Sequence, residues 1–217
     1  MIRIFWLLFL AATAAGLALP FQPASTWPWW DSAWILVFFV AAYADLVTAS
    51  SLSSARMAAG IVVISLAVLL GLGSLTGWPV GPLRFTEHSG LRLGGALPLV
   101  LPLFGFALLL ASRQVADAAL PSAGRTWLAA ATGAAVLVTI LNGLAFLMSD
   151  RLWWLWNPWG DGNASGRAVF SLAVLGFAAM ALSWALPVDS RLCTRRWTPG
   201  AIAWISTNVL FLVARLA

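Results

Sequence analysis

The chain has 217 residues, of which 62% are hydrophobic and 9% are charged. Ordinary soluble domains carry about 25% charged residues, and 12 basic and 7 acidic side chains supply too little polar surface for a water-soluble globule of this length. The composition therefore excludes a soluble enzyme and a disordered tail. It also excludes a nucleic-acid reader, because the net charge of +5 comes from arginines spread singly between apolar segments and not from a basic patch.

Seven apolar segments follow one another along the chain. Each has about 17–23 residues, enough for a helix that rises about 1.5 Å per residue to cross a hydrocarbon core of about 30 Å. They run near residues 3–20, 33–50, 57–75, 95–112, 126–148, 168–187 and 199–215. The sequence therefore predicts a single all-α domain, a polytopic integral membrane helical bundle of about seven transmembrane helices. A signal peptide is the alternative for the first segment, although the Trp-rich stretch after Pro20 is more typical of an interfacial anchor.

The arginines between the segments indicate the orientation in the membrane. With the N-terminus inside, the cytoplasmic side holds seven arginines and the outer side five. This mild bias predicts a multi-pass protein of the cell inner membrane with a cytoplasmic N-terminus. The two longest connections, 76–94 and 149–167, then lie on the same outer side. The single Cys and the single His predict neither a metal site nor a cofactor.

Polar groups inside a bilayer are costly, so each is a candidate for function or for a bond between helices. Asp45 lies in the second predicted span and could act as an intramembrane acid; the alternative is a hydrated carboxylate near the interface or a partner of Arg56. Asn142 lies deep in the fifth span, where an Asn usually bonds a neighbouring helix, although a ligand contact is the alternative. The polar notch at residues 206–208 in the last span has the same two interpretations.

The richest polar stretch follows the third span, at residues 75–90. Its prolines and glycines fix an irregular backbone where the span ends, and such backbone is tolerated at membrane depth only when it is buried in protein or lines a cavity. Arg84, Glu87 and His88 bring a cation, an acid and the only imidazole of the chain into one loop, where they could transfer protons. The alternative is a polar interfacial loop whose exposed Arg–Glu pair contributes little.

This stretch resembles a hallmark of the carotenoid biosynthesis membrane proteins of the CruF type, a family that includes bisanhydrobacterioruberin hydratase and the carotenoid 1,2-hydratases. The hallmark reads approximately T-G-F-P-F-G-x-Y-x-Y-T-D, and here it corresponds to residues 76–87, followed by a similar L-G and a Pro/Leu-rich run at 93–103. The run Leu-Trp-Trp-Leu-Trp at 152–156 resembles a second, aromatic hallmark after the fifth span. The resemblance implies that residues of the two hallmarks contact the substrate. They are Thr76, Gly77, Trp78, Pro79, Gly81, Pro82, Phe85, Thr86, Trp153, Trp154 and Trp156.

The resemblance also implies a reaction, the addition of water to the terminal double bond of an acyclic carotenoid. An acid protonates one alkene carbon, a tertiary cation forms and water captures it, while aromatic faces can stabilise the cation. On this pattern Glu87 is the expected proton donor, His88 or Arg84 tunes it, and Asn142 or Asp45 positions the water.

The chain departs from the family at several acidic and tyrosine positions. Leu70 stands where the family usually carries a Glu, Leu83 and Phe85 replace two tyrosines, and Asn142 and Phe146 occupy acidic positions of the fifth span. A chain without these acids could instead be a catalytically degenerate carotenoid- or lipid-binding or assembly subunit. The few intramembrane charges argue against a transporter or channel. The expected partners are membrane lipid, a long apolar carotenoid or isoprenoid, and other membrane enzymes of the carotenoid pathway, with no nucleic acid.

Overall fold

The computed structural model describes residues 2–18, 30–80, 83–85, 91–147, 154–156, 164–186 and 198–216. Within these residues the chain forms seven α-helices and two small sheets of two strands each. The helices are α1 (Ile2–Ala18), α2 (Trp30–Ala49), α3 (Leu52–Thr76), α4 (Val100–Ala119), α5 (Arg125–Leu147), α6 (Ala164–Ser183) and α7 (Pro199–Leu216). The strands are β1 (Leu83–Phe85), β2 (Arg92–Leu93), β3 (Leu97–Pro98) and β4 (Trp154–Trp156).

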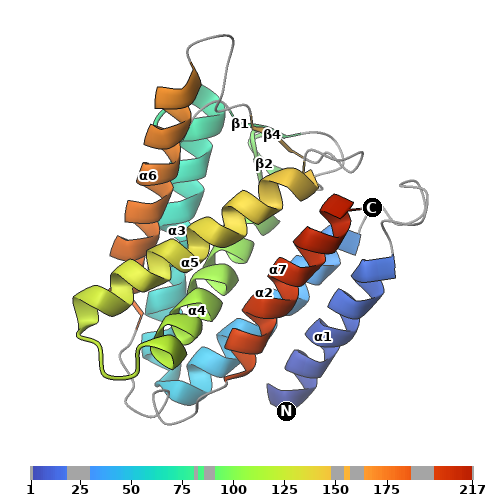
Figure 1. Cartoon of the computed structure of the whole chain (residues 1–217), viewed down its shortest axis with the longest axis vertical. Helices are drawn as coiled ribbons and strands as arrows, with labels where there is room; N and C mark the ends of the chain where they lie inside the picture. The colour runs from blue at the N-terminus through green and yellow to red at the C-terminus, as the bar shows by residue number, and fades with distance from the viewer. Residues whose placement is uncertain are drawn as a thin grey trace.

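The helices run alternately up and down and form one bundle, with the two termini at opposite ends (Figure 1). Helix α4 occupies the middle, where it packs against α2, α3, α5 and α7. The strands lie at the upper end, where α3 ends and α4 begins (Figure 1). The two longest connections of the chain therefore lie on the same side of the bundle, as the sequence predicts.

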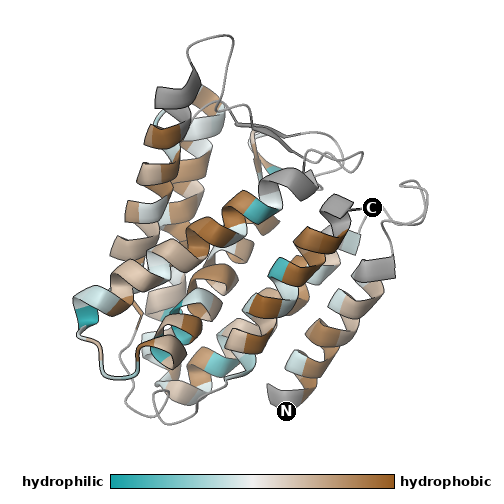
Figure 2. Cartoon of the chain, viewed as in Figure 1, coloured by the Kyte–Doolittle hydropathy of each residue, from teal (hydrophilic) through white to brown (hydrophobic). Residues whose placement is uncertain are grey.

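The outside of the bundle is apolar, as expected for a surface that faces lipid. Four helices are long and apolar enough to cross a membrane, and α1, α6 and α7 contain shorter apolar stretches among the described residues. Large apolar side chains such as Leu7, Ile64 and Phe177 are 64–70% exposed, an arrangement that is unfavourable in water when it extends over so much of the surface. Polar residues gather at the lower ends of α4 and α5 (Figure 2). The chain is thus an all-α membrane helical protein.

Helix α4 is displaced from the predicted fourth span, 95–112, and occupies Val100–Ala119. It begins later because β2 and β3 pair as a tight antiparallel hairpin, whose turn contains Gly94 and Gly95 at φ of 57° and 74°, a conformation that favours glycine. It continues beyond Arg113 because that guanidinium pairs with Asp117 one turn later. The predicted end at residue 112 was wrong, because the ion pair with Asp117 allows the charged side chain of Arg113 to stay buried inside the helix.

Glycines allow neighbouring helices of the bundle to approach closely, as small residues do in membrane proteins. A Cβ atom at Gly133 of α5 would lie 2.9 Å from the backbone oxygen of Gly176 in α6. A Cβ at Gly176 would in turn lie 2.8 Å from the side chain of Leu137. Helix α4 approaches α3 in the same way, because the side chain of Leu66 occupies the space beside Gly105.

The α5–α6 contact gives a first testable prediction. Gly133→Ala should lower the free energy of unfolding by about 1–3 kcal/mol, because the new methyl group must displace backbone of α6. Gly60→Ala is the matched control, since a Cβ at that position meets no atom within 4 Å. Thermal unfolding of the detergent-solubilised protein measures both variants; equal midpoints would contradict the close contact.

Candidate functional site

The two hallmark segments of the sequence come together as a pair of strands. Strands β1 and β4 are antiparallel, with Leu83 opposite Trp156, Arg84 opposite Leu155 and Phe85 opposite Trp154. About 70 residues separate these strands along the chain. Their pairing therefore joins two segments that are distant in the sequence. The structure thus places the Gly/Pro-rich hallmark beside the Trp-rich hallmark, a contact that the sequence alone does not give.

The turn that begins the first hallmark is held by hydrogen bonds of Thr76. Its hydroxyl group lies 2.7 Å from the carbonyl oxygen of Leu72 and accepts a hydrogen bond from the backbone N–H of Trp78 at 3.1 Å. Gly77 ends α3 in the left-handed conformation, at φ 72°, which favours glycine at this position. The Trp78–Pro79 peptide bond is cis. These contacts turn the chain inward, so that Val80 is only 1% exposed.

Several predicted site residues lie outside the described part of the chain. They are Gly81, Pro82, Thr86, Glu87, His88 and Trp153. Their predicted roles therefore remain predictions. By chain order, Glu87 follows the last residue of β1 by two positions.

An apolar cavity of about 100 Å³ lies inside the hallmark turn. It is bordered by α3, α4, α5 and α6, and Val80 lines it from the turn. Its wall on α4 runs from Leu101 to Leu109, a distance of about 12 Å along the helix axis. All the lining residues are apolar: Leu66, Leu70, Val80, Leu101, Phe104, Gly105, Leu108, Leu109, Val136, Ile140, Leu175, Ala178, Ala179 and Leu182. A cavity of this character accepts an apolar group and excludes an ordered water.

Phe104 is the aromatic residue of the cavity lining. Its ring centroid lies 5.9 Å from that of Trp34 and 6.2 Å from that of Phe38, both on α2. Phe9 of α1 stacks on Phe38 at 4.5 Å and extends this aromatic cluster away from the cavity. The cluster restrains the ring of Phe104 at the wall between the cavity and the N-terminal helices.

Asn142 bonds a neighbouring helix. Its side-chain N–H donates to the Oδ1 atom of Asn208 on α7 at 2.8 Å. Asn208 donates in turn to the hydroxyl oxygen of Thr139, at 2.9 Å, and to the backbone oxygen of Trp204. Of the polar notch predicted in the last span, Asn208 thus joins α7 to α5, whereas Ser206 and Thr207 donate to the backbone oxygen of Ala203 within α7. Asn142 does not line the cavity.

Asp45 has a different partner from the one considered in the sequence. Its carboxylate accepts a hydrogen bond from the Nε2 atom of Gln114 on α4 at 2.6 Å, and not from Arg56. The Oε1 atom of Gln114 accepts a second bond from the backbone N–H of Gly200, at 3.0 Å. Gln114 therefore links α2, α4 and α7, and it is 2% exposed.

The bond to Gln114 also fixes the depth of Asp45 in the bundle. Gln114 lies fourteen residues beyond Val100, the first residue of α4, which corresponds to about 21 Å along the helix. The strands lie at the other end of α4 (Figure 1). Asp45 is therefore far from the hallmark turn, and the structure does not bring it together with β1.

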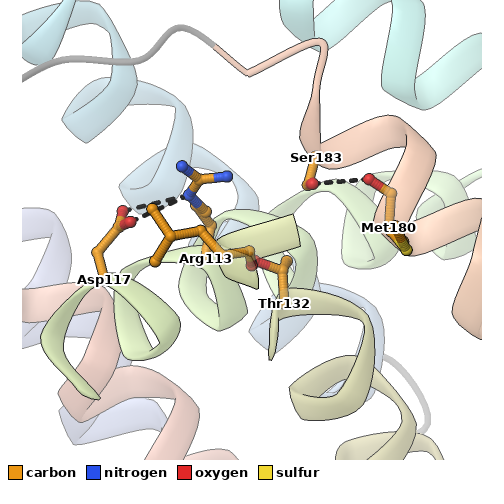
Figure 3. Close-up of polar contacts among 6 residues, drawn as sticks. Arg113, Asp117, Thr132, Met180 and Ser183 are labelled. Atoms are coloured by element: carbon orange, nitrogen blue, oxygen red, sulfur yellow. Dashed lines mark hydrogen bonds and ion pairs between the residues drawn. The ribbon is translucent and has the colours of Figure 1, made fainter. Parts of the chain in front are cut away.

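Arg113 and Asp117 form a buried ion pair that the sequence analysis missed. The Nε atom of Arg113 lies 3.2 Å from Oδ1 and 3.3 Å from Oδ2 of Asp117 (Figure 3). Both residues are less than one-tenth exposed. The same view shows Ser183 of α6, whose hydroxyl group donates to the backbone oxygen of Met180. The spacing of four residues between an Arg and an Asp is the signal that could have identified the pair.

A family model described as a carotenoid biosynthesis protein matches residues 31–170. The match covers more than half of the chain and includes both hallmark segments. The chain belongs to the carotenoid biosynthesis protein family. A comparison with curated proteins found no match, and neither did a comparison with solved structures.

Membership of the carotenoid biosynthesis protein family gives the chain a role in carotenoid biosynthesis. The matched residues contain α2 to α5, whereas α1 and α7 lie outside the match. Three of the polar bonds described above cross this limit, because Gly200 and Asn208 both belong to α7. These bonds join the last helix to the part of the bundle that the family shares.

The ion pair at the lower end of α4 gives a second prediction. Asp117→Ala should lower the free energy of unfolding by about 3 kcal/mol or more, because it leaves the buried guanidinium group of Arg113 without its partner. The double variant Arg113→Met/Asp117→Leu should recover most of this loss, since it removes both charges. Thermal midpoints in detergent measure the difference; a double variant as unstable as the single one would contradict the burial of the pair.

Proposed function

We propose that the protein is a carotenoid hydratase, which adds water to the terminal double bond of an acyclic carotenoid. The observation that carries this proposal is the apolar cavity that Val80 of the hallmark turn lines. Val80 lines the cavity, and Glu87 follows Val80 by seven positions in the chain. The proposal therefore places the acid of this segment beside an alkene that the cavity holds. The family membership supports a carotenoid as the apolar ligand.

The proposed reaction consumes one alkene and one water and regenerates the acid. The carboxyl group of Glu87 gives its proton to the less substituted alkene carbon, where the π electrons form the new C–H bond. The neighbouring carbon becomes a tertiary cation, and the oxygen of a water molecule forms a C–O bond to it. The proton that this water loses returns to the carboxylate of Glu87. The product is a tertiary alcohol at the end of the polyene.

The other groups of the proposed site have supporting roles. The aromatic ring of Phe104 stabilises the cation from the cavity wall, and Arg84 or His88 tunes the acid from the hallmark loop. Neither Asp45 nor Asn142 lines the cavity, so in this proposal the loop positions the water in their place.

A second function, binding without conversion, is favoured by the chemistry of the cavity wall. The lining residues carry no acid or base. Two carboxylates whose contacts the structure gives, those of Asp45 and Asp117, are bound to Gln114 and Arg113 at the other end of α4. A protein of this kind would hold a carotenoid or lipid, or assemble with other membrane enzymes of the carotenoid pathway, and release its ligand unchanged.

The proposed setting is the cell inner membrane, crossed several times, with a cytoplasmic N-terminus. The strand end of the bundle then faces the outer side, because the N-terminus and the strands lie at opposite ends (Figure 1). Water for the reaction would reach the hallmark loop from that side.

The decisive experiment is expression in a host that accumulates an acyclic carotene, followed by mass analysis of the extracted pigments. The wild-type protein should yield pigments heavier by one water per modified end. Glu87→Gln keeps the shape of the side chain but removes the acid, and it should lower hydration about 100-fold or more. Asp45→Asn is the control, because its side-chain oxygen can still accept the bond from Gln114.

The two proposed functions differ in their outcome. Full hydration by the Glu87→Gln variant would contradict the role of that acid. Pigment that copurifies with the wild-type protein but carries no added water would favour binding without conversion.

A further inference from the structure

The cavity is too small to hold a whole carotenoid. Its volume of about 100 Å³ is below that of an engineered protein cavity of about 150 Å³ that holds one benzene molecule. Its wall on α4 extends over about 12 Å. Only the end of a long polyene fits into this space, so most of the chain must leave the cavity through a gap between helices.

Three of the four helix pairs around the cavity are closed by tight packing. Helices α3 and α4 interlock where Leu66 lies against Gly105, and α5 and α6 interlock where Gly133 lies against the backbone of Gly176. Helices α4 and α5 pack together along their lengths. A polyene cannot pass between helices in such close contact without separating them.

The fourth pair, α3 and α6, is different. Both helices line the cavity, yet they do not pack closely against each other in the described part of the chain. Ser171 of α6 lies 3.5 Å from the carbonyl oxygen of Pro79, in the turn after α3, and this contact closes the upper end of the gap. Below it, α6 presents Leu175, Ala178 and Leu182 to the cavity, and each of them is only partly buried.

The outward-facing surfaces of the two helices are apolar. Phe177 on α6 is 70% exposed and Val68 on α3 is 56% exposed, as expected where helices face lipid chains. A polyene in the bilayer therefore meets apolar side chains on both helices. The residues that line the cavity carry no charge either.

We infer that the acyclic end of the polyene enters the cavity sideways from the bilayer, between α3 and α6, and that the rest of the polyene stays outside this gap. The inference rests on the proposed carotenoid ligand, and it adds the route of entry and the part of the ligand that the cavity holds. Ala178 is a small, partly buried side chain of α6 that lines the cavity, so a larger side chain there would narrow this route.

The test is a bulky substitution in the gap with a matched control on the same helix. Ala178→Trp should fill the gap and lower the carotene that copurifies with the protein about tenfold or more. Ala181→Trp is the control, because Ala181 is exposed and does not line the cavity; it should retain pigment like the wild type. Val136→Phe fills the cavity from α5 and should also lose the pigment. Each variant is purified from the same carotene-accumulating host, and its folding is checked by elution as a single detergent-solubilised species.

The outcomes separate the route of entry from the reaction. Loss of pigment in Ala178→Trp and Val136→Phe, with retention in Ala181→Trp, supports the route even if no water is added, in which case only the hydratase proposal fails. Full retention in Ala178→Trp with loss in Val136→Phe would overturn the route, because the ligand would then enter elsewhere. Equal loss in both α6 variants, or a wild-type protein without pigment, would also overturn it.

Discussion

A bilayer supplies no water to buried polar groups, and this constraint explains most of the side-chain hydrogen bonds in the bundle. Threonines inside the helices bond the carbonyl group one turn earlier, as Thr132 does with Leu128 and Thr207 does with Ala203. Side chains with more donors bond across helices, as Gln114 does with Asp45 and with the backbone of Gly200. Because the bonds across helices join defined positions, the residues that make them determine how the apolar helices are aligned.

The same constraint separates the two ends of α4. Its lower end carries the charged and amide groups, and the partners of Arg113 and Gln114 are protein atoms. Its upper half borders an apolar cavity and the hallmark turn. A polar group at the cavity wall would need a partner or a water molecule, and the apolar lining supplies neither. In the proposed reaction the acid must therefore come from a residue outside this lining, such as Glu87, and not from a helix wall.

The sequence predicts the helices better than it predicts the site. Hydropathy over about twenty residues locates all seven helices, because a span needs an unbroken apolar stretch, and an Asn at the depth of Asn142 predicts an interhelical bond correctly. The sequence does not predict the start of α4 or the bond between Asp45 and Gln114. Both depend on residues that meet only in the folded chain. The cavity leaves no signal in the sequence, because a leucine at its wall has the same hydropathy as a leucine that faces lipid.

Binding in such a cavity differs from hydrophobic binding in water. Lipid chains are about as apolar as leucine, so moving a polyene end from the bilayer into the bundle gains little from the hydrophobic effect. The gain comes from dispersion contacts in a space that is otherwise empty, and it depends on how well the end group fits between Phe104, Val80 and their neighbours. Affinity for the whole polyene would then be modest, while selection at its end would be sharp. This is the balance that a proposed end-group hydratase needs, because the modified polyene must return to the bilayer after its end has reacted.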